Sequence, residues 1–174
     1  MTSQRMSWNL FSKGMRVLGI DPSLRSTGYA VLEGDRKQQS VLEFGLIKTK
    51  TGEPLEASLI HIAESLENIL VQHQPKILAI EDIFTAKNIR VALQLGHVRG
   101  VVIVVCRRSG LTAAEYSATR IKETVAGYGR ADKKQIQHMV TRTLKLSEEP
   151  PSDAADAMAA ALTHFFWNES GGSG

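Results

Sequence analysis

Two short apolar segments, each ending in a carboxylic acid, constrain the fold of this chain most strongly. Residues 16–21 read Arg-Val-Leu-Gly-Ile-Asp, and residues 77–81 read Ile-Leu-Ala-Ile-Glu. Short apolar runs of this kind, bounded by turn residues, are typical of buried strands. In layered α/β domains, ligand-binding and catalytic groups often lie where such strands end. We therefore expect a buried sheet in which Asp21 and Glu81 stand at the ends of two strands.

Turn residues and hydrophobic spacing predict the other elements. Segments 28–32 and 41–47 favour two more strands, which short turns join to the first in an antiparallel meander. Residues 53–74 carry leucine and isoleucine at helical spacing. Segment 89–108 is rich in β-branched residues like a strand, but its apolar residues recur every three or four positions, which favours a helix. A further strand at 112–116 and helices at 119–126, 133–146 and 153–167 complete an α/β domain in which helices cover a sheet.

The length of 174 residues fits one domain. Residues 1–14 show no sustained hydrophobic period, and residues 170–174 have the composition of a linker. We expect an N-terminal extension over 1–14, a single domain over 15–168 and a flexible tail over 169–174. The single cysteine, Cys106, cannot form an internal disulfide, which favours a reducing intracellular setting. No uninterrupted apolar run approaches the roughly 18 residues of a membrane span, so no membrane partner is expected.

The charges are unevenly distributed along the chain. The formal net charge is only +3, but residues 85–145 hold twelve basic and three acidic side chains. The rest of the chain carries an excess of acids. A basic segment of this kind suits a polyanionic partner such as nucleic acid, although a solvated surface would also explain some of the charges.

Two further acids, Asp153 and Asp156, lie three residues apart, which places both on one face of a helix. Turn formation by Asp21, an exposed strand end at Glu81 and helix capping by Asp153 are the structural alternatives. Clustered carboxylates repel one another unless a cation neutralises them, and their hard oxygens suit Mg²⁺ or Mn²⁺. Two such ions can activate a water and stabilise the leaving oxygen in phosphodiester hydrolysis. Four acids beside a basic segment therefore favour a metal-dependent nuclease.

Phe84 follows Glu81 by three residues and lies close in sequence to Lys87 and Arg90. An aromatic ring beside cations can stack on an unpaired base while the cations hold phosphates, whereas a core position is the common structural role of phenylalanine. Further candidate phosphate contacts, each of which could equally be a surface charge, are Arg120, Lys122, Arg130, Lys133 and Lys134.

Several motifs together resemble a known family. They are Gly-Ile-Asp-Pro-Ser-Leu-Arg-Ser-Thr-Gly-Tyr at 19–29, Ala-Ile-Glu-Asp-Ile-Phe at 79–84, Ala-Lys-Asn at 86–88, Leu-Gly-His-Val-Arg-Gly at 95–100, Gln-Ile-Gln-His-Met at 135–139 and Asp-Ala-Ala-Asp-Ala at 153–157, followed by Thr163-His164. In this order they resemble the RuvC-type Holliday-junction resolvases, from about Met15 to Phe166. Ser23 departs from the glycine found in many members.

The resemblance implies a ribonuclease-H-like fold with a five-stranded mixed sheet, three antiparallel strands first, flanked by helices. It also implies a homodimer with much of its interface on Val91–Val105, and Mg²⁺-dependent paired symmetric nicking of four-way DNA junctions in recombination and repair. Its partners would be a junction-binding protein and a branch-migration ATPase of the RuvAB type, in the cytoplasm and at the nucleoid of a bacterium. By resemblance the catalytic acids are Asp21, Glu81, Asp153 and Asp156, Phe84 stacks at the junction centre, and Lys122 and Lys133 bind DNA or assist catalysis.

Other functions share parts of this pattern. A nuclease of the same fold acting on RNA would need the same acids. A junction-binding module without activity would have no use for four acids, because carboxylates near a polyanion weaken binding unless they hold metal. An actin-like sugar kinase or ATPase also opens with a Gly-Ile-Asp strand, but it needs two such domains and phosphate loops.

Overall fold

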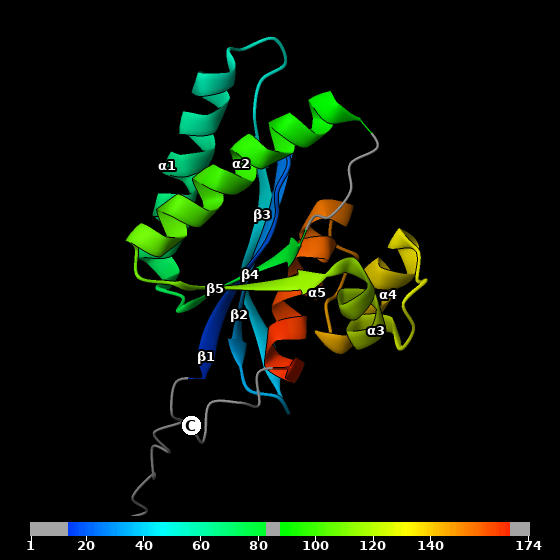
Figure 1. The fold of residues 1–174 in the computed structure, drawn as a ribbon. Coiled ribbons are helices and arrows are strands. Elements are labelled where there is room, and N and C mark those ends of the chain that lie inside the picture. The colour runs from blue at the N-terminus through cyan, green and yellow to red at the C-terminus, as the bar shows by residue number, and fades with distance from the viewer. Residues whose placement is uncertain (1–13, 83–87, 168–174) are drawn as a thin grey trace, which may run out of the picture.

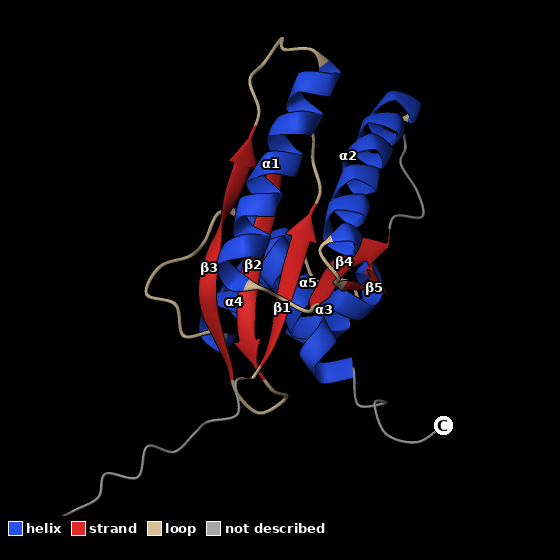
Figure 2. Cartoon of the chain, turned by 90° about the vertical axis from the view of Figure 1, so that its left-hand side faces the viewer, coloured by secondary structure: helices blue, strands red, loops and turns tan. Residues whose placement is uncertain are grey.

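A five-stranded mixed sheet forms the centre of the fold, and helices cover both of its faces (Figures 1 and 2). The computed structural model describes residues 14–82 and 88–167. The strand order is β3-β2-β1-β4-β5, with β1 and β2 antiparallel, β2 and β3 antiparallel, and β4 and β5 added in parallel beside β1. The strands are β1 (Met15–Asp21), β2 (Ser26–Gly34), β3 (Gln39–Lys48), β4 (Ile77–Asp82) and β5 (Thr112–Ser117).

The helices divide into two layers. Helices α1 (Leu55–His73) and α2 (Ile89–Arg108) cover one face of the sheet. Helices α3 (Ala118–Ala126), α4 (Lys133–Thr143) and α5 (Ser152–Trp167) cover the other. Alternating side chains of the central strands point into the two cores on either side of the sheet. Leu18 and Ile20 of β1 face α1 and α2, whereas Val17 faces α5.

Helix α5 lies unusually close to the sheet because glycine and alanine meet at their contact. A Cβ atom at Gly19 of β1 would lie 1.9 Å from the backbone oxygen of Ala157, and one at Gly28 of β2 would lie 2.0 Å from that of Asp153. Ala154 and Ala157 are fully buried in this contact. The missing side chains therefore bring the first two turns of α5 directly onto β1 and β2.

The predicted elements are confirmed, with small shifts at their ends. The β-branched segment is the helix α2, as its spacing favoured. The helix predicted over 133–146 ends at Thr143, since Leu144 caps it and Lys145 takes a positive φ of 53°. The proposed extension and tail fall largely outside the described residues, so the domain boundaries stay predictions.

Among the described residues, one helix, α2, is long and apolar enough to cross a membrane by length and composition alone. Arg90 and Arg99 interrupt the apolar residues of this helix, so the length of uninterrupted apolar runs did not predict it. In the fold, Val98, Val102 and Cys106 of α2 are fully buried in the core that it shares with α1 and the sheet. Other apolar residues of α2, among them Ile89, Leu93 and Val104, are exposed, and 22% of its apolar window is buried.

The close contact of α5 predicts a large loss of stability for Gly28→Ala. The added methyl group meets backbone atoms of Asp153, which cannot move without shifting the whole helix. We expect the free energy of unfolding to fall by about 3 kcal/mol, as measured by urea denaturation. An unchanged denaturation midpoint would contradict the packing of α5 on β2.

Candidate active site

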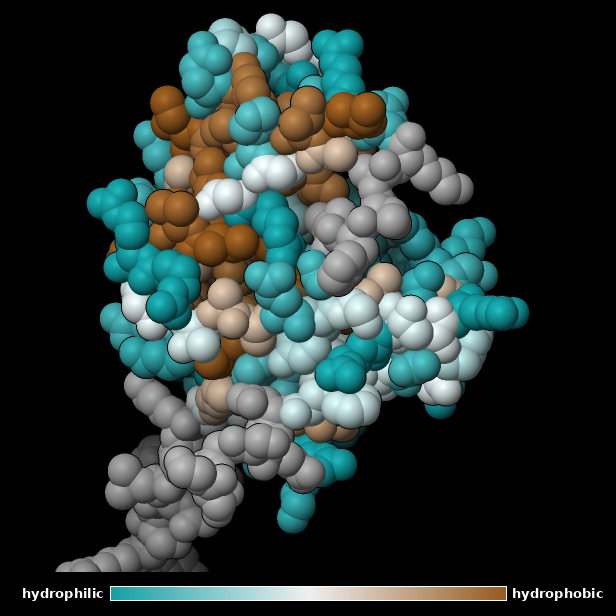
Figure 3. All heavy atoms as spheres, viewed as in Figure 1, coloured by the Kyte–Doolittle hydropathy of each residue, from teal (hydrophilic) through white to brown (hydrophobic). Residues whose placement is uncertain are grey.

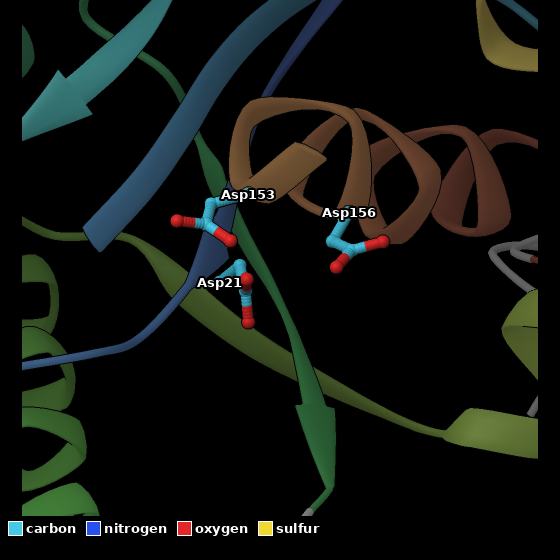
Figure 4. Close-up of side chains that lie close together, drawn as sticks. All are labelled: Asp21, Asp153 and Asp156. Atoms are coloured by element: carbon cyan, nitrogen blue, oxygen red, sulfur yellow. The ribbon is translucent and has the colours of Figure 1, made fainter. Parts of the chain in front are cut away.

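Three aspartates from two elements meet at one end of the sheet. Asp21 is the last residue of β1, and Asp153 and Asp156 lie in the first two turns of α5. One carboxylate oxygen from each lies within 4.8 Å of the others, and all three side chains are partly buried. In Figure 4, Asp21 and Asp153 lie side by side, with Asp156 one turn further along α5. The spacing of three in the sequence therefore directs both α5 acids to the end of β1.

Local contacts hold two of these acids, Asp21 and Asp153, in place. Pro22 follows Asp21 directly, and the turn beyond it is closed by the Thr27 hydroxyl, which donates to the carbonyl of Ser23 at 2.6 Å. The Ser26 hydroxyl donates to Oδ2 of Asp153 at 2.9 Å, so β2 orients the first α5 acid. Each carboxylate is therefore held on a rigid element rather than on a loop.

Burial and mutual repulsion make Asp21 difficult to ionise. Burial, followed by the charges of Asp156 and Asp153, raises its pKa from 3.8 to about 7, against the opposing effect of Lys133. A carboxyl group with such a pKa is only partly ionised near neutral pH. A bound cation would favour the ionised form, and three carboxylate ligands fit a hard cation such as Mg²⁺. The donor set thus fits the metal expected from the sequence.

Glu81 lies beside the three aspartates rather than within their cluster. Burial and the charge of Asp156 raise its pKa, whereas Lys122, Lys133 and Arg99 lower it. Burial also raises the pKa of Asp156, although Lys133 contacts its Oδ2 at 3.2 Å and acts in the opposite direction. The same contact raises the pKa of Lys133, which therefore carries its positive charge at neutral pH.

A cavity of about 210 Å³ adjoins the acids on the side of α3 and α4. Glu81 and Asp156 form its acidic wall, and Lys122 and Lys133 form its basic wall. The rest of the lining is apolar and comes from Ala118, Ile121 and Ile136. A cavity with carboxylates opposite ammonium groups has the chemistry to hold a metal ion and a phosphate together.

Only some of the predicted basic residues that the structure describes lie at the acidic site. Lys122 and Lys133 reach the acidic site, whereas Arg90, Arg130 and Lys134 are exposed on the surface. The guanidinium of Arg120 stacks 4.5 Å from the ring centroid of Trp167. Phe84 and Lys87 lie outside the described residues, so their predicted contacts with nucleic acid stay predictions.

Two residues near the acids escaped sequence analysis. Ser26 gave no signal, because a serine in a strand next to a turn is common. Arg99 was visible as a charge inside the apolar stretch of α2, and its guanidinium donates to the carbonyl of Glu81. Cys106 is a fully buried core residue.

The sequence and the fold of this chain are similar to those of known proteins. A sequence model of the family described as crossover junction endodeoxyribonuclease RuvC matches residues 17–164, which is most of the chain. The chain belongs to the RuvC family.

Individual RuvC proteins extend this result. RuvC of Shewanella sp. (strain MR-4) is 46% identical over 154 residues, which cover 88% of each chain. RuvC of Caldicellulosiruptor saccharolyticus is 41% identical over 158 residues, 90% of this chain and 95% of the relative. Thermus thermophilus RuvC, solved in complex with a Holliday junction substrate, superimposes with a TM-score of 0.83 at 32% identity, covering 88% of this chain and 94% of that one. The ribonuclease-H-like fold expected from RuvC-type resolvases is confirmed.

The raised pKa of Asp21 predicts that metal binding by this RuvC protein weakens on acidification. A cation binds the ionised carboxylate, so protonation below pH 7 competes with it. We expect the affinity for Mn²⁺ to fall about tenfold for each pH unit below 7, with release of a proton on binding. Calorimetric titrations at pH 6 and pH 8, in two buffers of different ionisation enthalpy, measure both quantities. Equal affinities at the two pH values would contradict the shift.

Proposed function

We propose that this chain is a metal-dependent endonuclease that resolves four-way DNA junctions by paired, symmetric nicks. The meeting of Asp21, Asp153 and Asp156 within 4.8 Å carries the proposal. These acids occupy the motifs by which the sequence resembles the resolvases, and the similar T. thermophilus protein has been solved with a Holliday junction substrate. The function therefore combines a site suited to phosphodiester hydrolysis with a DNA substrate known for a relative.

In this proposal the four acids together bind two divalent cations, Mg²⁺ or Mn²⁺. Asp21, Asp153 and Asp156 supply the close ligand set, and Glu81 supplies a further carboxylate from β4. When bound, the ions supply a water of lowered pKa and stabilisation of the leaving 3′ oxygen. The hydrogen bond from Ser26 keeps Asp153 oriented. Asp21 is the last residue of β1, and its place in the strand limits the movement of its side chain.

The two lysines of the cavity act on the phosphate in this proposal. Lys133 holds Asp156 at 3.2 Å while most of its side chain stays exposed, so that it can also meet a DNA phosphate. Lys122 faces Glu81 and Asp156 from α3. Positive charge at both places offsets the repulsion between four acids and a polyanion. Phe84 stacking at the junction centre, with Lys87, Arg90, Arg120 and Lys134 on DNA phosphates, is proposed from the sequence.

We further propose that two copies of the chain pair through α2. Ile89, Leu93 and Val104 lie on one side of this helix with 79%, 61% and 55% of their surface exposed. Gly96 and Gly100 fall on the same side, and a Cβ at either would meet no atom within 4 Å. Figure 3 shows hydrophobic residues gathered over α1 and α2. Small residues between apolar ones allow a second helix to approach closely, and a two-fold dimer matches a two-fold junction.

The cellular setting follows from the same proposal. The bacterial relatives are named for action on DNA crossovers, which places such an enzyme in the cytoplasm. Association with the nucleoid, and action together with a junction-binding protein and a branch-migration ATPase of the RuvAB type, are proposed from the family resemblance alone.

Cleavage of a mobile four-way DNA junction tests the proposed activity. We expect Mg²⁺-dependent paired nicks that are absent with EDTA and absent on a linear duplex. Asp21→Asn should reduce the cleavage rate at least about a thousandfold, because it removes a central carboxylate, while leaving junction binding intact. Electrophoresis of end-labelled strands measures cleavage, and a gel-shift assay in EDTA measures binding.

The other outcomes of this experiment separate the alternative functions. Cleavage by Asp21→Asn at the normal rate would contradict the metal site. Tight junction binding by the unchanged protein without nicks would indicate a binding module. Nicking of an RNA duplex or junction in preference to DNA would indicate a ribonuclease of the same fold.

The proposed dimer predicts a distinct effect of Leu93→Glu. Leu93 is exposed in the single chain, so the substitution should leave the fold intact while placing a charge in the pairing face. We expect a monomer by light scattering. On a plasmid with an extruded cruciform, we expect nicked circles in place of linear product. Val71→Glu alters an even more exposed apolar residue, on α1, and should remain dimeric. A dimeric Leu93→Glu protein would contradict the α2 interface.

A further inference from the structure

Arg99 links the outer helix α2 to the strand end that carries Glu81. Its Nη1 atom donates to the backbone carbonyl of Glu81 at 2.6 Å. Its Nη2 atom donates to Oε2 of Glu115, on the neighbouring strand β5, at 2.7 Å. The Arg99 side chain is only 16% exposed, so one guanidinium joins two strands beneath α2.

The contact of Arg99 with Glu81 lies where β4 is no longer paired with β1. The pairing of β1 with β4 ends at Ile20 and Ile80, because β1 turns away after Asp21. The pairing of β4 with β5 continues to Asp82 and Ser117. From Glu81 onward, β4 is therefore paired with a strand on one side only. Arg99 bonds to the main chain of Glu81, the first residue of β4 beyond its pairing with β1.

The two hydrogen bonds of Arg99 use different nitrogen atoms of one guanidinium. Glu115 accepts from Nη2 while Nη1 donates to Glu81, so both partners restrict the orientation of the guanidinium. The planar fork of arginine can meet both partners at once, which the single ammonium of lysine cannot.

We propose that Arg99 is a positioning residue for Glu81: held by Glu115, it fixes the end of β4 so that the Glu81 carboxylate faces the aspartate cluster. This inference rests on the proposed function, since it assigns Glu81 to the metal site. Arg99 itself touches no substrate and no reacting atom. Because α2 also carries the proposed pairing face, the geometry of the acids then depends on how α2 is seated.

Arg16 offers a matched control. Its Nη1 atom donates to the backbone carbonyl of His73 at 2.7 Å, and its Nε atom donates to Glu33 of β2 at 2.8 Å. This guanidinium also joins a main-chain oxygen to a carboxylate of a neighbouring strand. It does so near the start of β1, at the opposite end from Asp21. Removing it should cost a comparable amount of stability without affecting the acids.

The test measures Mn²⁺ binding to the free protein by calorimetry. We expect Arg99→Gln to weaken Mn²⁺ binding about tenfold, as is typical when a group that orients a metal ligand is lost. Arg99→Lys should recover part of the affinity, Glu115→Gln should lose less, and Arg16→Gln should bind as the unchanged protein does. The Mg²⁺ concentration for half-maximal junction cleavage should rise with Arg99→Gln, while the rate at saturating Mg²⁺ and junction binding in EDTA stay within about twofold.

The outcomes distinguish this inference from the function on which it rests. Unchanged Mn²⁺ affinity in Arg99→Gln, or an equal loss in Arg16→Gln, would overturn the positioning role. If Arg99→Gln fails to fold, Arg99→Lys and Glu115→Gln decide the question by the same titration. An unchanged protein that binds Mn²⁺ but never cuts junctions would overturn the proposed function instead, and the Mn²⁺ comparison would still decide the role of Arg99.

Discussion

The close packing of α5 on the sheet is the constraint on which the site depends. Gly19 and Gly28 leave no side chain between the strands and the helix, and a Cβ at either would meet the helix backbone at about 2 Å. Only this short separation lets Asp153 and Asp156 reach the end of β1. The alanines of α5 therefore serve the chemistry as well as the core, because larger side chains would move the acids away from Asp21.

This packing creates an electrostatic cost that the surrounding residues offset only in part. Three carboxylates brought together and partly buried raise the pKa of Asp21 to about 7. Lys133 acts against that shift and contacts Asp156 directly, but burial still dominates at both aspartates. A group of acids that the fold leaves short of positive charge is arranged for a cation that the chain itself does not supply. Stability and metal affinity are thus opposed at Asp21.

Much of this could be predicted from the sequence, for identifiable reasons. Strand ends and helix spacing are local, so Asp21, Glu81 and the pair on α5 were found from their neighbours in the chain. The contacts that orient them are not local. Ser26 meets Asp153 across 127 positions, and Arg99 reaches Glu81 and Glu115 only after α2 has crossed the sheet. The three-aspartate cluster, with Glu81 beside it, likewise depends on strand order and on the depth at which α5 packs.

Helix α2 shows how one element can connect assembly with chemistry. Its inner side, with Val98 and Val102, is fixed in the core, and its outer side presents Gly96 and Gly100 to the surroundings. Arg99 lies between these two sides and bonds to the strand end of Glu81. Because Arg99 bonds α2 to β4, a tilt of α2 would act on the strand end that carries Glu81. In the proposed dimer, pairing of two subunits would therefore be coupled to the alignment of the acids, which suits an enzyme proposed to make two nicks on one junction.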